Sequence, residues 1–529
     1  MNASSKVITR RHFLNHLGVI GGSALLIDAM QAFGMQFASS ATRPPVLNKL
    51  TNSKKVVILG AGLAGLCAAY ELKKYGYQCT ILEARPHGGG RCQTARRGTV
   101  LDEVTGLSNR CEFDEDQYYN HGPWRIPYHH RSTLYYTKAL SIPLEIMIND
   151  NEQAFVYSDV GKGPLKNKAI RRMALAADMR GYESEILAKS IHQGQLDLPL
   201  RQEDMEVFVS YLVNHGALRG KDLDYLGTDG RGYDTPRGAL LNAGKQSTPY
   251  AIQDLLDSRL WNSIQSVASY DQPKTMFQPI GGMDKLAHGF EAAVGDVITY
   301  DAEVASIRQN NSGVTVNYRN TKATSDHSLQ ADYCICTIPL TVLKNIAIDI
   351  PQPSKQAMNS ASTVASCKLG MQMKRRFWEE DDAIYGGHSR VTLEGDTSNI
   401  SYPSYDYQSQ KGIVQGVYNF TGSAIRYSAM SREERVEYAL KFGAAIHPQF
   451  RENYENSFGV AWHLVKYSLG AYIHWSERGM EKDYPLLCEP QGRILLAGDH
   501  MSHMPGWMAG AFESTWLQIE TLHKMALAA

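Results

Sequence analysis

The stretch Gly60-Ala61-Gly62-Leu63-Ala64-Gly65 decides the fold of this chain. It follows an apolar run at 55–59, which predicts a buried parallel strand, and it opens a helix over about 63–75. The glycines let the chain turn tightly and bring backbone amides close to a pyrophosphate, toward which the helix points the positive end of its dipole. Glu83, at the end of the next apolar run, suits a ribose hydroxyl. Together these features predict a dinucleotide-binding unit rather than a structural glycine turn.

A second glycine-rich loop favours FAD over NAD as the dinucleotide. Gly88-Gly89-Gly90-Arg91 comes directly after Glu83-Ala84-Arg85. A short glycine loop that ends in a cation can run beneath the rest of an extended FAD. The first cofactor unit therefore extends from about residue 54 to about residue 98.

The C-terminal segment carries another part of the expected cofactor site. A predicted buried strand at 493–497 ends in Gly498-Asp499, where a carboxylate can accept a hydrogen bond from the ribityl chain of a flavin. Gly506 then opens a helix whose N-terminal dipole would stabilise negative charge on the reduced flavin ring. Because the first strand lies near residue 56 and the last helix near residue 510, the cofactor domain is predicted to be discontinuous.

Composition excludes several classes of protein. A chain of 529 residues, 43% hydrophobic and 20% charged, is expected to form two or three globular domains. The formal net charge of +0 offers no basic field for nucleic acid. The eight cysteines form no zinc-type pair and are too sparse for a disulfide scaffold, so buried free thiols are expected.

The N-terminus has the pattern of a twin-arginine export signal. Arg10-Arg11 precedes a modest apolar stretch at 17–27, which is too short to span a bilayer as a permanent anchor. This route carries folded proteins and suits an enzyme that loads its flavin before export. We expect a periplasmic or secreted protein, the alternative being a chance arginine pair before an amphipathic helix. No other segment is apolar enough to cross a membrane.

The pattern along the chain predicts an α/β protein (α+β overall). We expect a discontinuous Rossmann-like FAD-binding domain, a mixed-sheet substrate-binding domain and a helical insertion domain. Alternation at 297–300 and 314–318, with turn residues at 310–313, predicts a hairpin-like sheet. The expected divisions are 1–43 signal and linker, 54–100 FAD-binding, 101–165 substrate-binding, 166–272 helical, 273–360 FAD-binding, 361–485 substrate-binding and 486–529 FAD-binding.

Both glycine-rich elements and the C-terminal segment resemble the flavin amine oxidase family, in which Glu-Ala-Arg precedes an Arg-x-Gly-Gly-Arg pattern. His87 stands where the family often has arginine, and Asp499 where many members have glutamate. The resemblance implies FAD and no metal. The cofactor-binding residues that it implies are Gly60, Gly62, Ala64, Gly65, Glu83, Ala84, Arg85, Gly89, Gly90, Arg91, Gly122, Pro123, Trp124, Arg125, Val304, Gly498, Asp499, Gly506, Trp507, Met508 and Ala511.

The segment Gly122-Pro123-Trp124-Arg125-Ile126-Pro127 resembles the L-amino-acid oxidase branch of that family. In that branch the arginine of a Gly-Pro-x-Arg-x-Pro segment pairs with the carboxylate of the substrate. A planar guanidinium binds a carboxylate through two parallel hydrogen bonds. The alternative is a surface salt bridge by Arg125, but the apolar, proline-flanked segment favours a buried and paired arginine.

Further site residues follow from the same resemblance. Lys368 matches the lysine that holds a water against the reactive flavin nitrogen, the alternative being an exposed strand lysine. Tyr418 matches the tyrosine that gives the carboxylate a second hydrogen bond, with Tyr402 as a rival and a buried structural tyrosine as the alternative. Trp507, after Gly506, is expected to wall the substrate's α-carbon against the flavin rather than to pack in the core.

The resemblance implies FAD-dependent oxidative deamination of L-amino acids by molecular oxygen, giving 2-oxo acids, ammonia and hydrogen peroxide. A flavin amine oxidase or a decarboxylating L-amino-acid monooxygenase of the same architecture is the alternative. A secreted antimicrobial or lectin-like protein with a vestigial flavin is the rival from another class. Relatives carry a histidine late in the helical domain that is a proposed base, but none lies between His215 and His288. A homodimer is left open.

Overall fold

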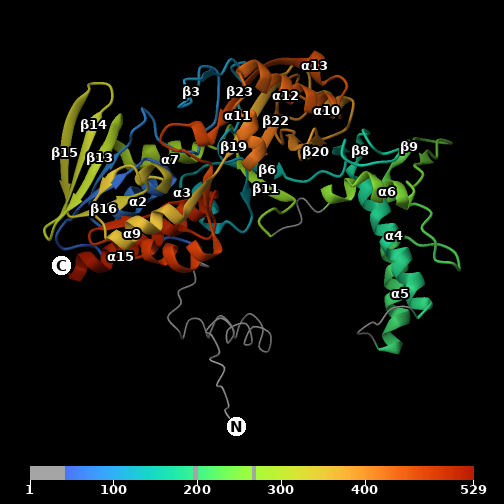
Figure 1. The fold of residues 1–529 in the computed structure, drawn as a ribbon, viewed down its shortest axis with the longest axis horizontal. Coiled ribbons are helices and arrows are strands. Elements are labelled where there is room, and N and C mark those ends of the chain that lie inside the picture. The colour runs from blue at the N-terminus through green and yellow to red at the C-terminus, as the bar shows by residue number, and fades with distance from the viewer. Residues whose placement is uncertain (1–41, 195–200, 265–269, 529) are drawn as a thin grey trace, which may run out of the picture.

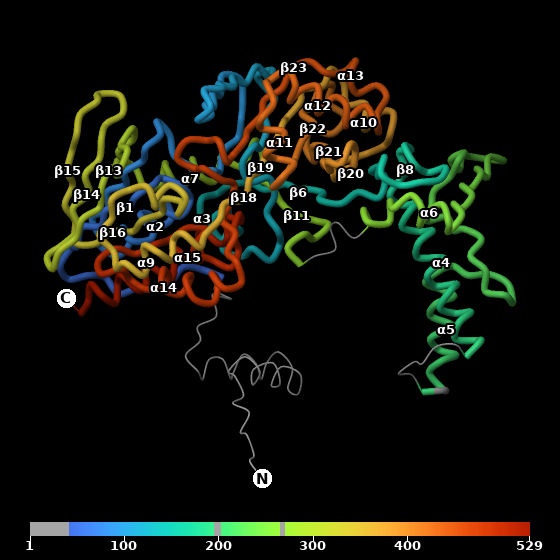
Figure 2. The backbone as a smooth tube through the Cα atoms, in the orientation of Figure 1, coloured from blue at the N-terminus to red at the C-terminus, as the bar shows by residue number. Residues whose placement is uncertain are grey.

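The computed structural model describes residues 42–194, 201–264 and 270–528. The twin-arginine motif lies outside the described residues. The molecule is elongated: the cofactor sheet lies at one end, a seven-stranded sheet lies in the middle, and helices α4 and α5 project from the other end (Figures 1 and 2). Among the described helices, none has the length and apolar character needed to cross a membrane.

The cofactor sheet is parallel and is assembled from four distant parts of the chain. Its strands run in the order β12-β2-β1-β16-β25, and each neighbouring pair is parallel. The core residues of α2 (Leu63–Lys73) and α15 (Met508–Ala528) pack with those of the sheet in one apolar cluster. The predicted discontinuous α/β domain is therefore confirmed. The strands are β1 (Lys55–Leu59), β2 (Gln78–Leu82), β12 (Ile298–Thr299), β16 (Tyr333–Cys336) and β25 (Ile494–Leu496).

A second sheet covers the other side of the cofactor sheet and corrects one prediction. Its hairpin joins β13 (Ala302–Gln309) to β14 (Val314–Asn320) through the predicted turn at 310–313. The prediction that residues 297–300 form the first strand of this hairpin sheet was wrong. Ile298–Thr299 is a strand, but it pairs in parallel with β2 in the cofactor sheet. Short alternating runs carry no information about which sheet they join. The sheet is completed by β15 (Ser325–Ala331) and β17 (Ala347–Ile348).

The seven-stranded sheet has one apolar face and one polar face. Cys367, Leu369 and Met371 of β19 belong to a buried cluster shared with α11–α13. Because side chains alternate along a strand, Lys368 lies on the opposite face. The order is β23-β19-β22-β21-β20-β7-β8. The bounds are β7 (Phe155–Ser158), β8 (Ile170–Arg171), β19 (Ser366–Met373), β20 (His388–Leu393), β21 (Asp396–Ser401), β22 (Gly412–Phe420) and β23 (Tyr454–Ala461).

The projecting unit is built on two long helices. Helix α4 (Arg172–His192) packs against α5 (Gln202–Gly216) around a small apolar cluster. After α5 the chain forms a short 3₁₀ helix, η1 (Asp229–Arg231), and the strand pair β9 (Tyr233–Thr235) and β10 (Lys245–Gln246). It then forms α6 (Ile252–Ser258). These helices agree with the expected helical insertion, while the domain boundaries stay predictions.

All eight cysteines are free thiols, with seven buried and Cys488 partly exposed.

Shorter elements complete the fold. The other strands are β3 (Val100–Asp102), β4 (Ser108–Arg110), β5 (Ile126–Pro127), β6 (Leu144–Ile148), β11 (Thr275–Pro279), β18 (Ala361–Val364) and β24 (Tyr472–Trp475). The other helices are α3 (Arg131–Ala139), α7 (Lys285–Val294), α8 (Leu340–Leu343), α9 (Gln352–Ala357), α10 (Phe377–Glu380), α11 (Thr421–Ser428), α12 (Arg432–Ala444), α13 (Phe450–Asn453) and α14 (Tyr484–Cys488).

Candidate active site

A cavity of about 490 Å³ runs along the carboxyl ends of the cofactor strands. Ligands of open α/β sheets bind at this edge. Most of the predicted cofactor residues line it: Gly60, Gly62, Ala64, Glu83, Ala84, Arg85, Gly89, Gly90, Arg91, Pro123, Val304, Gly498, Asp499, Gly506, Trp507, Met508 and Ala511. Gly65, Gly122, Trp124 and Arg125 do not line it.

The two glycine loops touch, and this contact explains why they lack side chains. A Cβ added to Gly90, where φ is +59°, would lie 3.1 Å from the Cα of Gly62. A Cβ on Gly65 would lie 2.0 Å from the carbonyl oxygen of Gly60, so Gly65 allows the helix to pack against the turn instead of lining the cavity. Side chains on these loops would fill the floor of the cavity, so the loops fit a dinucleotide that approaches the backbone closely.

Glu83 is fixed at the edge of the cavity. Its buried carboxylate accepts hydrogen bonds from the backbone N–H of Ala61 at 2.7 Å and of Arg85 at 2.9 Å. Each carboxylate oxygen has a second lone pair to offer to a hydroxyl group. The carboxylate is thus held rigidly where the sequence predicts a ribose partner.

Arg91 and Asp499 form an ion pair that joins the first and last parts of the cofactor domain. The backbone N–H of Gly506 also donates to Asp499, at 2.9 Å. Burial opposes ionisation of this carboxyl, but Arg91, His500 and the Gly506 amide together hold its pKa below the usual range. Sequence reasoning placed both residues in the site without pairing them, because they lie far apart in the chain.

The cavity has further walls that sequence reasoning missed. The loop after β16, at Thr337 to Pro339, and the pair Tyr467 and Ser468 both face it. Arg85 donates to the Lys466 carbonyl oxygen and to the Ser468 hydroxyl, each through Nη2. Tyr467 and Ser468 lie outside the glycine-rich motifs of the sequence, so they reach the site through tertiary folding alone.

Lys368, Tyr418, Trp124 and Arg125 form a cluster beside this cavity. The Nζ of Lys368 donates to the Gly122 carbonyl oxygen at 2.6 Å and lies 4.6 Å from the centre of the Tyr418 ring. The Arg125 guanidinium lies 5.1 Å from the Trp124 ring, whose edge meets Tyr418. Strand register explains part of this arrangement, because Lys368 on β19 pairs directly with Tyr418 on β22.

The cluster carries positive charge in a partly dehydrated setting. Burial and the charge of Arg125 lower the pKa of Lys368 to about 7. Burial also lowers the pKa of Arg125, while the Tyr418 hydroxyl opposes this shift. Within the described residues Arg125 has no carboxylate within ion-pair distance, so the expected alternative of a surface salt bridge finds no partner there.

Tyr418 and its rival Tyr402 lie on different faces of the seven-stranded sheet. The Tyr402 hydroxyl is bonded to Ser389 and His447 at 2.7 Å each, within the apolar cluster. Tyr418 faces Arg125 and Lys368, and the positive charge of Arg125 offsets part of the rise in its pKa caused by burial. The geometry therefore places Tyr418, and not Tyr402, beside the arginine.

Two residues of β20 lie beside this positive field and were missed by sequence reasoning, and of the two Arg390 carries charge. His388 and Arg390 share a face of their strand, and burial followed by the charges of Arg125, Arg172 and Arg390 lowers the pKa of His388 to about 3. In the described part of the chain Arg172 pairs with Asp150, whereas Arg390 has no acidic partner. Nothing in the sequence of a single strand tells which face an arginine occupies.

Trp507 and Pro123 both line the cofactor cavity, and Pro123 precedes the cluster of Arg125 directly in the chain. Gly506, with φ of +80°, makes the turn before α15 and brings its Cα close to the Tyr472 ring. Trp507 also meets the edge of His130, with ring centres 4.8 Å apart. The tryptophan thus stands at the wall of the cofactor cavity rather than within a hydrophobic core, and its role toward the substrate's α-carbon stays a prediction.

A parallel sheet with a pyrophosphate-type turn, a cavity for an extended dinucleotide and a cationic cluster beside it define an α/β flavoprotein oxidoreductase. The family model of flavin-containing amine oxidoreductases matches residues 63–518. The chain belongs to this family, and its cofactor is FAD. Both predictions are confirmed.

Two relatives that match most of this chain are called L-amino-acid oxidases. The chain is 28% identical over 494 residues to a putative L-amino-acid oxidase, YobN, of Bacillus subtilis (strain 168), covering 88% of this chain and 94% of the relative. It is 26% identical to an L-amino-acid oxidase of Vipera ammodytes ammodytes, and the match covers 88% of this chain and 92% of the relative.

Solved structures share the fold. Wild-type putrescine oxidase bound to putrescine has a TM-score of 0.57 at 18% identity, covering 90% of this chain and 100% of that one. Cyclohexylamine oxidase from Brevibacterium oxydans IH-35A has a TM-score of 0.57 at 17% identity, and the match covers 90% of this chain and 100% of that one.

Proposed function

We propose that this protein oxidises L-amino acids to 2-oxo acids, with release of ammonia and hydrogen peroxide. One observation carries the proposal: the Arg125 guanidinium is partly buried beside Tyr418 and has no acidic partner in the described chain. A buried cation without a counterion is costly, and a substrate carboxylate would relieve that cost through two parallel hydrogen bonds.

The electrostatics favour an amino acid over a simple amine. Arg125, Lys368 and Arg390 bring positive charge to one face of the sheet without a carboxylate partner in the described residues. Such a field repels an ammonium ion that has no carboxylate and attracts an anionic group. Putrescine and cyclohexylamine, named for the structural neighbours, carry no carboxylate for this field to attract.

Each residue of the cluster has a role in this proposal. Arg125 and the Tyr418 hydroxyl hold the carboxylate, and Trp507 limits where the α-carbon lies. Lys368, anchored on the Gly122 carbonyl oxygen, directs its remaining N–H groups into the site and can hold a water. Bound FAD supplies the two-electron oxidation and passes the electrons to oxygen. In balance, an amino acid, oxygen and water become a 2-oxo acid, ammonia and hydrogen peroxide.

Product analysis tests this proposal against its nearest alternative. With the twenty L-amino acids in a peroxide-coupled assay, we expect equal amounts of 2-oxo acid and peroxide for the accepted substrates. A decarboxylating monooxygenase would instead give an amide and carbon dioxide, and that result would replace the proposal. Binding of FAD without turnover of any L-amino acid or amine would favour the rival with a vestigial flavin. If the protein kills target cells through the peroxide that it forms, catalase should protect those cells, and this result would argue against the rival.

We also propose that the protein is exported by the twin-arginine route and acts in the periplasm or outside the cell. The support is the sequence pattern at Arg10-Arg11 and the apolar stretch at 17–27. In a bacterial host with this translocase, R10K/R11K should retain the enzyme in the cytoplasm, because the paired arginines are the signal that the translocase reads. Peroxide-forming activity of separated cell fractions measures the effect. Unchanged export of the double variant would contradict the proposal.

A further inference from the structure

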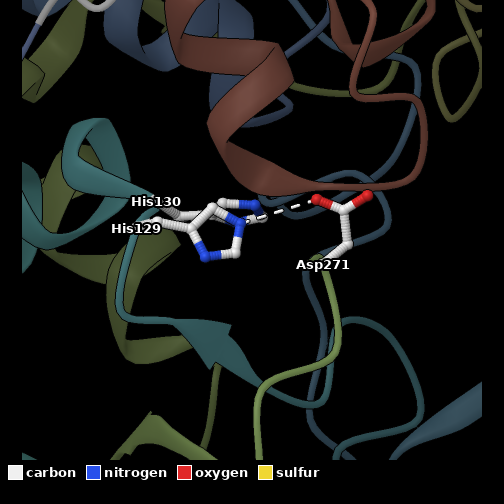
Figure 3. Close-up of side chains that lie close together, drawn as sticks. All are labelled: His129, His130 and Asp271. Atoms are coloured by element: carbon white, nitrogen blue, oxygen red, sulfur yellow. Dashed lines mark ion pairs between the residues drawn. The ribbon is translucent and has the colours of Figure 1, made fainter. Parts of the chain in front are cut away.

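Two histidines and an aspartate meet at the start of α3 (Figure 3). His129 and His130 directly precede the helix, and Asp271 lies four residues before β11. One ligand atom of each residue lies within 4.8 Å of those of the other two. The imidazoles therefore come from one segment and the carboxylate from a segment far away in sequence, brought together by the fold.

Hydrogen bonding does not account for this arrangement. Both ring nitrogens of His129 and the Nε2 of His130 are buried and have no hydrogen-bond partner among the described residues. The nearest approach is that of His129 Nε2 to a carboxylate oxygen of Asp271, at 3.5 Å. Leaving a buried polar atom unsatisfied costs about 1–3 kcal/mol, so unpartnered nitrogens on two adjacent imidazoles point to a bound group.

The donor atoms of the cluster suit a cation. A neutral imidazole is the form that binds a metal ion, and the carboxylate supplies negative charge.

We propose that His129, His130 and Asp271 bind a divalent transition metal ion of the zinc class. Two imidazole nitrogens and one carboxylate oxygen form a donor set that Zn²⁺ prefers, with water free to complete a tetrahedron. Nitrogen donors disfavour Mg²⁺ and Ca²⁺, which take oxygen ligands. These residues would bind the ion whether or not L-amino acids are the substrates.

The proposed metal site lies next to the cofactor cavity. His130 is almost fully buried, and its ring edge contacts Trp507, which lines the cofactor cavity. Asp271 is more than half exposed, so an ion can reach the cluster from solvent. A bound ion would tie the start of α3 to the segment before β11 and would fix the histidine that contacts Trp507.

The test uses the full-length holoenzyme, freed of metal with a chelator, and Zn²⁺ alone in calorimetry. We expect one site per chain, with Zn²⁺ affinity at least tenfold weaker in H129A and in D271N. Co²⁺ should give the visible absorption of a tetrahedral site in the wild type and should lose it in both variants. Because Asp271 is exposed, D271N should keep the metal-free unfolding temperature of the wild type.

The control is H474A, which removes an exposed histidine of β24 far from this cluster in the chain. It should bind Zn²⁺ as the wild type does. Absence of Zn²⁺ binding, or equal affinity in the wild type, H129A and D271N, would overturn the proposal. The readouts are binding and absorption, so they stay independent of whether L-amino acids are the substrates.

Discussion

Replacing Arg125 by alanine is expected to lower kcat/KM for L-amino acids between about 150-fold and about 5,000-fold. The substrate carboxylate would then be buried opposite Tyr418 without its cation, and truncating one member of a buried charge pair costs about 3–5 kcal/mol. FAD should stay bound, because Arg125 does not line the cofactor cavity. Steady-state peroxide formation and the flavin absorbance of the purified variant measure the two effects.

Arg125→Lys should recover little of this loss, because an ammonium cannot form the paired fork. Arg131→Ala is the matched control, since Arg131 is an exposed arginine six residues further on at the start of α3. It should retain the wild-type kcat/KM. Near-normal efficiency of Arg125→Ala would show that the arginine does not hold a carboxylate, and it would favour an amine substrate.

Replacing Lys368 by methionine is expected to slow the reaction of the reduced enzyme with oxygen by about tenfold to a hundredfold, and to slow reduction by substrate much less. A fixed positive charge stabilises the negative charge that develops on oxygen in a site of low dielectric constant. Methionine keeps most of the volume, although the Gly122 carbonyl oxygen loses its donor, at a cost of about 1–3 kcal/mol in stability. Stopped-flow measurement of the two half-reactions separates them.

The rate of the reaction with oxygen is also expected to depend on pH, in a direction set by the charge of Lys368. The pKa of Lys368 is lowered to about 7, so the lysine is charged below this pH and neutral above it. Reaction with oxygen should therefore be fastest at low pH and should fall as the pH rises through about 7. Lys368→Met should remove this step. Lys374→Met, which changes an exposed lysine just after the same strand, should preserve it. Equal oxygen rates in Lys368→Met and the wild type would leave Lys368 without a part in the chemistry.

The cofactor site could be predicted from sequence because its signals are local. The turn at Gly60 to Gly65 and the loop at Gly88 to Arg91 require glycines for contacts between their own backbones, and such contacts leave a recognisable spacing. Arg125 was identifiable for a similar reason, because the prolines beside it argue for a buried segment. These features do not depend on how distant parts of the chain pair.

Features that depend on pairing could not be predicted in the same way. Choosing between Tyr402 and Tyr418 requires the strand register, which shifts between Leu369 and Gly370. The same limit hid Arg390, whose face on β20 follows from the sheet and not from its neighbours in sequence. The contact of Arg91 with Asp499 likewise arises only when the first and last parts of the domain come together.

The most direct test of the central claim compares an L-amino acid with the amine that lacks only its carboxylate, such as L-phenylalanine and phenethylamine. The accepted L-amino acid is first chosen in the peroxide-coupled assay, and both compounds are then mixed anaerobically with the yellow holoenzyme. We predict that the amino acid bleaches the flavin absorbance and that its amine does so at least a hundredfold more slowly, because only the amino acid offers a carboxylate to Arg125. Bleaching by the amine at an equal or higher rate would contradict the account.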